Sequence, residues 1–291
     1  MGSGTVLIGY QPTPEGRDAA RLGRLFAELL GAKPLVASVF PWPAYLVPVE
    51  EAEAGLSSAA SSLFDEARAE LEGLEPETRV FADRSPALAL QRLAAESDAE
   101  LIVVGSSNRG VLGRTLAGSV GESLLADAPC AVAVASRGLS ARPQAPVARI
   151  GVAFDGSPEA RSALETAVEL AGRLGAQVYV VTVAEFPRYG LGTSYSILTK
   201  GEYEDAERQE KKRILQRALD RVPDELRAEG QLLTGGAGAK LAEAAADYDL
   251  MVAGSRGYGA VRRTALGSAT RVLVREAPCP ILVVPRGAGD E

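Results

Sequence analysis

The 291-residue sequence contains no histidine. Histidine-based acid–base catalysis, a Ser-His-Asp triad and a histidine metal site are therefore excluded. Only two cysteines are present, Cys130 and Cys279, and each lies in an Ala-Pro-Cys triplet just before an apolar run. A small residue at such a position typically begins a buried strand, so both cysteines are interpreted as structural thiols.

Long apolar runs and basic stripes are also missing. No run approaches the roughly 18 to 20 apolar residues of a membrane span, and the N-terminus lacks the pattern of a secretory signal. The formal net charge is −7, and lysine and arginine are scattered among acidic residues. We therefore expect a cytoplasmic protein without a membrane or nucleic-acid partner. Any phosphate would be held by backbone N–H groups and one or two local cations.

The chain repeats itself. LIVVGSSNRGVLGRTLAGSVGESLLADAPCAVAVASRG, from Leu101, aligns without a gap with LMVAGSRGYGAVRRTALGSATRVLVREAPCPILVVPRG, from Leu250. LIGYQPTPEGRDA, from Leu7, aligns with GVAFDGSPEARSA, from Gly151. Two related domains are predicted, residues 1–142 and 147–291, joined by a connector rich in proline, arginine and serine that is expected to be solvated.

In each half, apolar strands alternate with helices. In the second half, strands are predicted for ARIGVAF, QVYVVTVAEF, QLLTG, DLMVAG and PILVVP. A helix is predicted from the Ser157-Pro158 cap to Gly175, and a long amphipathic helix over residues 202–229. Continuous Val/Ile/Leu runs indicate a parallel sheet covered by helices on both faces, which is an α/β fold.

Glycines are concentrated between the last two strands, in DLMVAGSRGYGAVRRTALGSATRVLV, although glycine weakens regular elements. Gly254 closes one strand, and Gly267-Ser268 opens the following helix. Ligands of open parallel sheets bind beyond the carboxyl ends of strands, and phosphates bind at helix N-termini. We therefore expect Ser268 to cap the helix and Gly267 to let an anion approach the backbone. The alternative is that these residues only permit turns.

The spacing Gly254-x2-Gly257-x9-Gly267-Ser268 resembles the G-x2-G-x9-G-[ST] signature of the universal stress protein family. The resemblance covers essentially the whole chain twice, as a tandem member. It implies two tandem Rossmann-like domains of the adenine nucleotide alpha hydrolase-like type, each with a five-stranded parallel sheet of order 3-2-1-4-5 flanked by helices. It also implies ATP, with Mg²⁺ on its phosphates, between the first and fourth strands, although some members are nucleotide-free. AMP or ADP in place of ATP stays open.

The resemblance further implies which residues of the second half contact the nucleotide. Asp155 would meet the adenosine end, and the backbone of Val183 would pair with adenine. The other contacts would line the pocket or bind ribose and phosphate: Ala153, Ala253, Gly254, Gly257, Gly267, Ser268 and Ala269. Arg262 and Arg263 are weaker candidates, because loop arginines are more often solvated, and no protein ligand to Mg²⁺ is predicted. Asp155 alone would more simply be a turn residue in Asp-Gly-Ser-Pro.

The first half departs from the signature at two positions. Gln11 replaces the acidic residue, and Asn108 replaces the second glycine. Asparagine adds a Cβ and an amide where backbone should approach phosphate, although it tolerates positive φ. We therefore expect weaker or no nucleotide binding at the corresponding residues: Gln11, Val39, Gly105, Asn108, Gly118 and Ser119.

Three functions fit these patterns. The first is an ATP-binding stress-response protein that acts as a sensor more than as a catalyst, because no general base is evident near the phosphates. The second is a nucleotide-free scaffold that works through protein contacts, and the third is a slow ATP hydrolase. The GGAGAK segment from Gly235 is not a P-loop, because Leu241 follows Lys240, and it is interpreted as a turn into a helix.

Assembly follows from the last strand of each half. By the same resemblance, CAVAVAS and CPILVVP are expected to pair with each other and hide two sheet edges. The chain would then form an intrachain pseudo-dimer. A further homodimer, which the family often forms, stays open.

Overall fold

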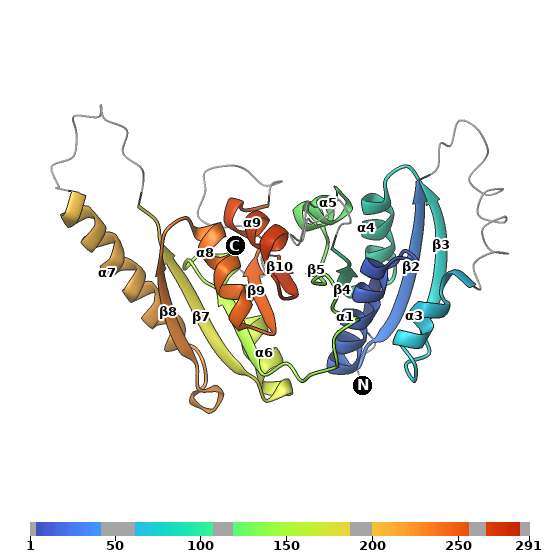
Figure 1. Ribbon diagram of the computed structural model, residues 1–291, viewed down its shortest axis with the longest axis horizontal. Coiled ribbons are helices and arrows are strands. Elements are labelled where there is room, and N and C mark those ends of the chain that lie inside the picture. Colours follow the sequence, from blue (N-terminus) through green and yellow to red (C-terminus); the bar gives the residue numbers. More distant parts are fainter. Residues whose placement is uncertain (1–3, 42–61, 107–118, 187–199, 256–265, 286–291) are drawn as a thin grey trace.

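The computed structural model describes residues 4–41, 62–106, 119–186, 200–255 and 266–285 (Figure 1). The elements of the first half are β1 (Thr5–Gly9), α1 (Pro14–Leu30), β2 (Lys33–Pro41), α3 (Asp65–Glu70), β3 (Glu77–Asp83), α4 (Pro86–Glu96), β4 (Ala99–Val104), α5 (Ser119–Asp127) and β5 (Ala131–Val134). Those of the second half are β6 (Arg149–Ala153), α6 (Pro158–Leu174), β7 (Gln177–Ala184), α7 (Lys200–Leu219), β8 (Glu229–Thr234), α8 (Ala237–Ala244), β9 (Leu250–Gly254), α9 (Ser268–Glu276) and β10 (Ile281–Val284).

The ten strands of the described residues form one sheet, in the order β3-β2-β1-β4-β5-β10-β9-β6-β7-β8. Within each half the strands run parallel and follow the order 3-2-1-4-5. The halves are joined by an antiparallel pair, β5 and β10, in which Leu282 lies opposite Ala133. The expected α/β class is therefore confirmed, but the two parallel sheets are parts of a single mixed sheet.

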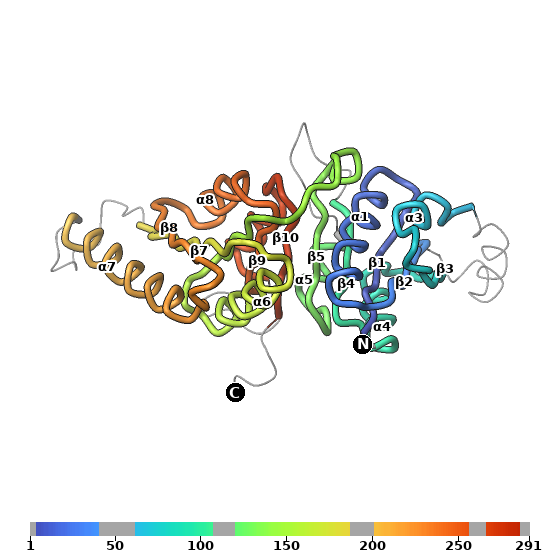
Figure 2. Tube along the Cα trace, turned by 90° about the horizontal axis from the view of Figure 1, so that it is seen from below, coloured from blue at the N-terminus to red at the C-terminus, as the bar shows by residue number. Residues whose placement is uncertain are grey.

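The pairing of β5 with β10 lies at the centre of the molecule (Figure 2). It covers the edge that each half would otherwise expose, as the family resemblance implied. Strands β3 and β8 are left as the outer edges of the sheet. Since β5 and β10 are used within the chain, a homodimer would need other surfaces.

The core consists of two apolar layers, one on each face of the sheet. Side chains alternate along a strand, so Val6 and Ile8 join the layer under α1 and α6, whereas Leu7 joins the layer under α4 and α8. Both layers are rich in Val, Ile, Leu and Ala. None of the helices in the described part of the chain combines the length and apolar character that a bilayer crossing requires.

The helix that follows β6 begins and ends as the sequence predicts. The Ser157 hydroxyl accepts a hydrogen bond from the Ala160 N–H at 3.1 Å, and Pro158 follows at the first helical position. Gly175 ends the helix with φ of 67°, the left-handed conformation that glycine adopts without strain. The predicted cap and the predicted stop are both confirmed.

The long amphipathic helix is shorter than predicted. Helix α7 ends at Leu219, and β8 already begins at Glu229, whereas the charge pattern suggested one helix over residues 202–229. Pro223 lies in the intervening turn, where it lacks the N–H that a helix needs. Arg227 then has φ of 48°, which breaks the helical path. Pro223 therefore prevents the helix from continuing to residue 229, although the charge pattern alone would allow it.

The first part of the connector is held to the first half, whereas residues 141–146 are exposed, as expected of a solvated segment. The Asp18 carboxylate on α1 is 1% exposed and accepts three hydrogen bonds of 2.7 Å, from the Gly138 N–H, the Ser140 N–H and the Ser140 hydroxyl. Val147, near the far end of the connector, is also buried. A buried carboxylate with three donors fixes this turn as part of the fold.

Replacing Ser140 with alanine is expected to lower the free energy of unfolding by about 1 kcal/mol, because one of the three hydrogen bonds to Asp18 is lost while both backbone bonds stay. Ser162→Ala is the matched control, since its hydroxyl makes only a 3.4 Å bond to the carbonyl one turn earlier in its own helix. Urea denaturation of both variants measures the difference. Equal midpoints for the two variants would show that the Ser140 hydroxyl does not help Asp18 to hold the connector.

The two cysteines are free thiols at the starts of β5 and β10. Burial raises the pKa of the Cys130 thiol to about 11 and that of Cys279 to about 12. Both thiols therefore stay protonated near neutral pH and are poor nucleophiles. Their environment agrees with a structural role.

Candidate functional site

The carboxyl ends of the central strands lie at equivalent places in the two halves. In the second half β6 pairs with β7 on one side and with β9 on the other, so the chains that follow β6 and β9 diverge to opposite faces. In the first half β1, β2 and β4 have the same relation. This divergence is where open α/β sheets bind ligands.

Asp155 lies in the turn between β6 and α6. Its Oδ1 accepts a hydrogen bond from the Ser157 N–H at 2.9 Å, which forms the turn that the Asp-Gly-Ser-Pro sequence suggests. Gly156 within this turn has φ of 88°. The turn interpretation of Asp155 is thus realised, and it places the carboxylate at the carboxyl end of β6.

Gly254 has a packing role that the sequence did not reveal. A Cβ at this position would lie 2.7 Å from the backbone carbon of Glu159, in the first turn of α6. The equivalent Gly105 in the first half would meet the Glu15 carbonyl oxygen at 2.2 Å. Glycine is therefore required at both strand ends because a helix packs directly on the backbone there, whether or not a ligand binds.

The start of α9 differs from the prediction by one residue. Gly267, not Ser268, is the N-cap residue, and no side chain of the described residues caps the helix. The Gly267 N–H donates to the Ser255 carbonyl at 2.9 Å, while the Thr270 hydroxyl donates to the Gly254 carbonyl at 2.9 Å. These two bonds tie the helix start to the end of β9. The amides of the first helical residues, beginning with Ser268 and Ala269, have no acceptor within the helix.

The apolar residues predicted around the second-half site lie at the strand ends. Ala153 and Ala253 face each other across the β6–β9 ladder, and Ala253 is buried. Val183 lies near the end of β7 and is also buried. The structure therefore brings the ends of β6, β7 and β9 together, as the motif assignment requires.

Several predicted residues lie outside the described part of the chain. They are Asn108, Gly118, Gly257, Arg262 and Arg263. Ser119 begins α5, as expected for the residue after the final glycine of the motif in the first half. The GGAGAK segment forms the turn into α8, whose first amide, that of Ala237, donates to the Glu185 carboxylate at 2.6 Å. A protein carboxylate therefore occupies this helix start.

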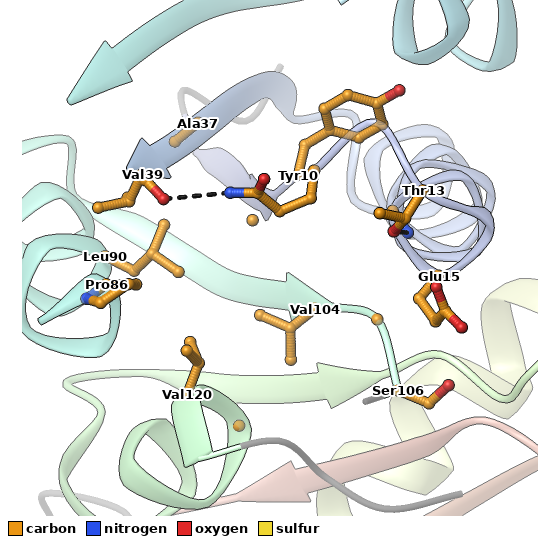
Figure 3. Close-up of a pocket in the computed structure, with 15 residues that line it drawn as sticks. Tyr10, Thr13, Glu15, Ala37, Val39, Pro86, Leu90, Val104, Ser106 and Val120 are labelled. Carbon is orange, nitrogen blue, oxygen red and sulfur yellow. Dashed lines mark hydrogen bonds between the residues drawn. The ribbon is translucent and has the colours of Figure 1, made fainter. Parts of the chain in front are cut away.

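The first half contains a pocket of about 430 Å³ (Figure 3). Its lining residues come from the ends of β1, β2 and β4 and from the starts of α1, α4 and α5. They are Gly9, Tyr10, Gln11, Thr13, Glu15, Gly16, Ala37, Val39, Pro86, Leu90, Val104, Gly105, Ser106, Val120 and Gly121. Three residues of the predicted first-half site, Gln11, Val39 and Gly105, therefore share one cavity.

Gln11 contacts the residue that the family resemblance assigns to the adenine edge. Its side-chain Nε2 donates a hydrogen bond to the Val39 carbonyl oxygen at 3.1 Å (Figure 3). Asp155, its counterpart in the second half, has a carboxylate in place of the carboxamide and so lacks the N–H donors of Gln11. Asp155 therefore does not donate to the Val183 carbonyl oxygen a hydrogen bond like the one from Gln11 to Val39.

Glu15 and Ser106 line the pocket but were not among the predicted site residues. Glu15 stands in the first turn of α1, and Ser106 follows β4 by two residues. The signal available in the sequence was their position beside motif residues, Glu15 four after Gln11 and Ser106 next to Gly105. A glutamate in a first helical turn ordinarily only complements the helix dipole, so position alone did not single it out.

Two doubly wound α/β units in one sheet define a tandem Rossmann-like protein. The model of the universal stress protein family matches the chain twice, over residues 3–136 and 146–285. The chain therefore belongs to the universal stress protein family.

Relatives and solved structures agree with this assignment. A universal stress protein of Mycobacterium tuberculosis is 27% identical over 297 residues, which cover 97% of this chain and 99% of that protein. A second one from the same organism is 33% identical over 193 residues, 64% of this chain and 62% of that protein's length. The crystal structure of a universal stress protein from Archaeoglobus fulgidus has the same fold, with a TM-score of 0.69 at 20% identity over 99% of this chain and 100% of that one.

Proposed function

We propose that the protein is an ATP-binding universal stress protein that acts as a cytoplasmic nucleotide sensor in a stress response, with the nucleotide held mainly in the second half. One observation carries the proposal. The N-terminus of α9 begins with an uncapped glycine and is tied by two hydrogen bonds to the end of β9, beside the end of β6. Uncapped amides at such a place are suited to an anion.

In this proposal, different residues of the second half bind different parts of the nucleotide. The amides of Ser268 and Ala269 donate to phosphate oxygens, since they have no acceptor within the helix. Asp155 accepts hydrogen bonds from the adenosine end, and the backbone of Val183 pairs with the base. ATP brings Mg²⁺ on its phosphates, so the protein need not supply a metal ligand. AMP or ADP would use the same base and sugar contacts.

A sensor is favoured over a catalyst because phosphoryl transfer needs a group that orients water and a group that neutralises charge. The chain has no histidine, and the Thr270 hydroxyl at the start of α9 is engaged with the Gly254 carbonyl. Nucleotide binding would instead change the conformation of the chain or its choice of protein partner. Slow hydrolysis is then a side activity of the same site.

The test is to release bound ligand with acid from freshly purified protein and then to titrate the protein with ATP in a calorimeter. We expect adenine nucleotide in the extract, or one site per chain in the titration. A blank extract together with no heat on titration would contradict the proposal and favour a nucleotide-free scaffold. Turnover of ATP within seconds would show that the protein is an enzyme and not a sensor.

A further inference from the structure

Strand β8 is an outer edge of the sheet, and its backbone is unpaired on one side. The Gly235 N–H, just after β8, donates to the Ala184 carbonyl of β7 at 3.1 Å. Because the backbone groups of successive residues in a strand point to opposite sides, those of Gly230, Leu232 and Thr234 point away from β7. None of the described residues hydrogen-bonds to these outward groups. The edge can therefore accept one more strand.

The residues of β8 do not protect this edge. Natural edge strands carry charged residues or prolines that discourage pairing with another chain. The other outer edge, β3, has Arg79 and Asp83 where β8 and its end have Gln231 and Gly235. From residue 230 to residue 234, β8 contains neither a charged residue nor a proline. Of the two outer edges, β8 is therefore the one open to pairing.

A second copy of the chain would bring an identical β8 to this edge. A two-fold axis pairs the two strands antiparallel, as β5 and β10 are paired within the chain. The internal pair leaves α1 and α6 in contact on one face of the sheet. Helix α7 packs on β7 and β8, at one outer end of the molecule (Figure 1, Figure 2). An antiparallel β8 pair would therefore place both copies of α7 on the same face.

The charges of α7 fit an antiparallel copy of the same helix. Residues 202–210 include five acidic residues and one arginine, and residues 211–217 include four basic residues and no acidic one. The axis would set the acidic half of each helix beside the basic half of the other. Because adjacent strands lie about 4.8 Å apart, the two helices would be roughly 10–15 Å apart, which long charged side chains can span.

The outermost charges of α7 are available for such contacts. Lys212 and Arg217 are exposed, and neither forms an ion pair with another described residue. The Asp205 side chain is 76% exposed, and it pairs only within its own helix, with Arg208 at 3.0 Å. Exposed pairs of this kind contribute little to folding but determine which surfaces associate.

We propose that β8 is an interaction surface for a second copy of the chain, and that two copies form a dimer in which one sheet runs through both. Leu232, the middle outward-facing residue, lies at the axis and exchanges two hydrogen bonds with the partner's Leu232. The assembly closes at two copies, because each chain has one unprotected edge and uses it. This surface is separate from the strand ends where we propose that the nucleotide binds.

Analytical ultracentrifugation of the full chain over a range of micromolar concentrations tests the surface. We expect a species of twice the chain mass of 30.3 kDa. Leu232→Pro removes an outward N–H but no hydrogen bond to β7, and it should weaken the dimer at least about tenfold. The matched control is Leu232→Ala, which loses the same side chain but keeps the N–H. Its dimer should stay within about threefold of the wild type.

Charge-swapped helices provide a second test that does not alter β8. One variant combines Lys212→Glu with Arg217→Glu, and the other combines Glu202→Lys with Asp205→Lys. All four residues are exposed, so both variants are expected to fold. Each variant alone should dimerise at least about tenfold more weakly, because like charges then face each other. An equimolar mixture should recover the dimer, since each acidic half again meets a basic one.

Mixing also separates association from the helix dipole, which the charges of α7 complement. A dipole effect would change the stability of each variant and would not be rescued by mixing. The proposal is overturned by a wild type that stays monomeric at tens of micromolar, by polymers larger than a dimer, by a dimer equally strong in Leu232→Pro, or by a mixture that is not rescued. If circular dichroism shows that Leu232→Pro is unfolded, the charge-swapped variants decide alone.

Discussion

Replacing Gly267 with aspartate is expected to lower the affinity for ATP at least about 100-fold while leaving the protein as stable as the wild type or more stable. Gly267 is the N-cap of α9, with φ of −56° and ψ of 142°, a conformation open to any residue. Aspartate is a strong N-cap and would accept hydrogen bonds from the first amides of the helix. The same carboxylate would occupy the phosphate position and repel it.

This variant is informative because its ATP affinity should fall while its stability does not. A merely damaged fold would lose both stability and affinity. Gly267→Ser is the matched control, since serine also caps a helix but carries no charge, and it should reduce affinity much less. Thermal unfolding measures the first effect, and calorimetric titration with ATP the second. Full ATP affinity in Gly267→Asp would mean that the phosphates do not bind at α9.

Gly254→Ala is expected to destabilise the protein by about 2–3 kcal/mol, although alanine is a small residue. The new Cβ would lie 2.7 Å from the backbone carbon of Glu159 and 2.8 Å from its oxygen. Backbone atoms cannot rotate away as a side chain does, so β9 and α6 would have to separate. Urea denaturation measures the loss.

Gly172→Ala provides the control for this prediction. Gly172 lies within α6 and is exposed, and a Cβ there meets no atom within 4 Å. This substitution should stabilise the protein by about 0.5–1 kcal/mol, because alanine favours a helix more than glycine does. If Gly254→Ala behaved like Gly172→Ala, the packing role of the first motif glycine would be wrong.

Much of the fold could be predicted, because it is set by patterns that are local or repeated. Continuous apolar runs gave the strands, Ser157-Pro158 and Gly175 gave the limits of α6, and the repeat gave the tandem arrangement. The strand order came from the family resemblance and not from the residues. The end of α7 was missed because the charge pattern was followed past Pro223.

The candidate site was less predictable, because its details depend on contacts between distant residues. The Gln11–Val39 hydrogen bond joins residues 28 positions apart, and no local pattern indicates which group an exposed glutamine will contact. Asp18 likewise contacts a connector more than a hundred residues later. The motif located Gly254 correctly, but the reason for a glycine there is the backbone of α6, which only the fold places beside it.

The central claim is that main-chain amides at the start of α9 hold the nucleotide. Hydrogen exchange of the full chain, followed by mass spectrometry with and without ATP, observes these amides directly. We predict slower exchange in the peptide that contains Ser268, Ala269 and Thr270, and unchanged exchange at the start of α5 in the first half. Unchanged exchange at α9 under saturating ATP would contradict the account.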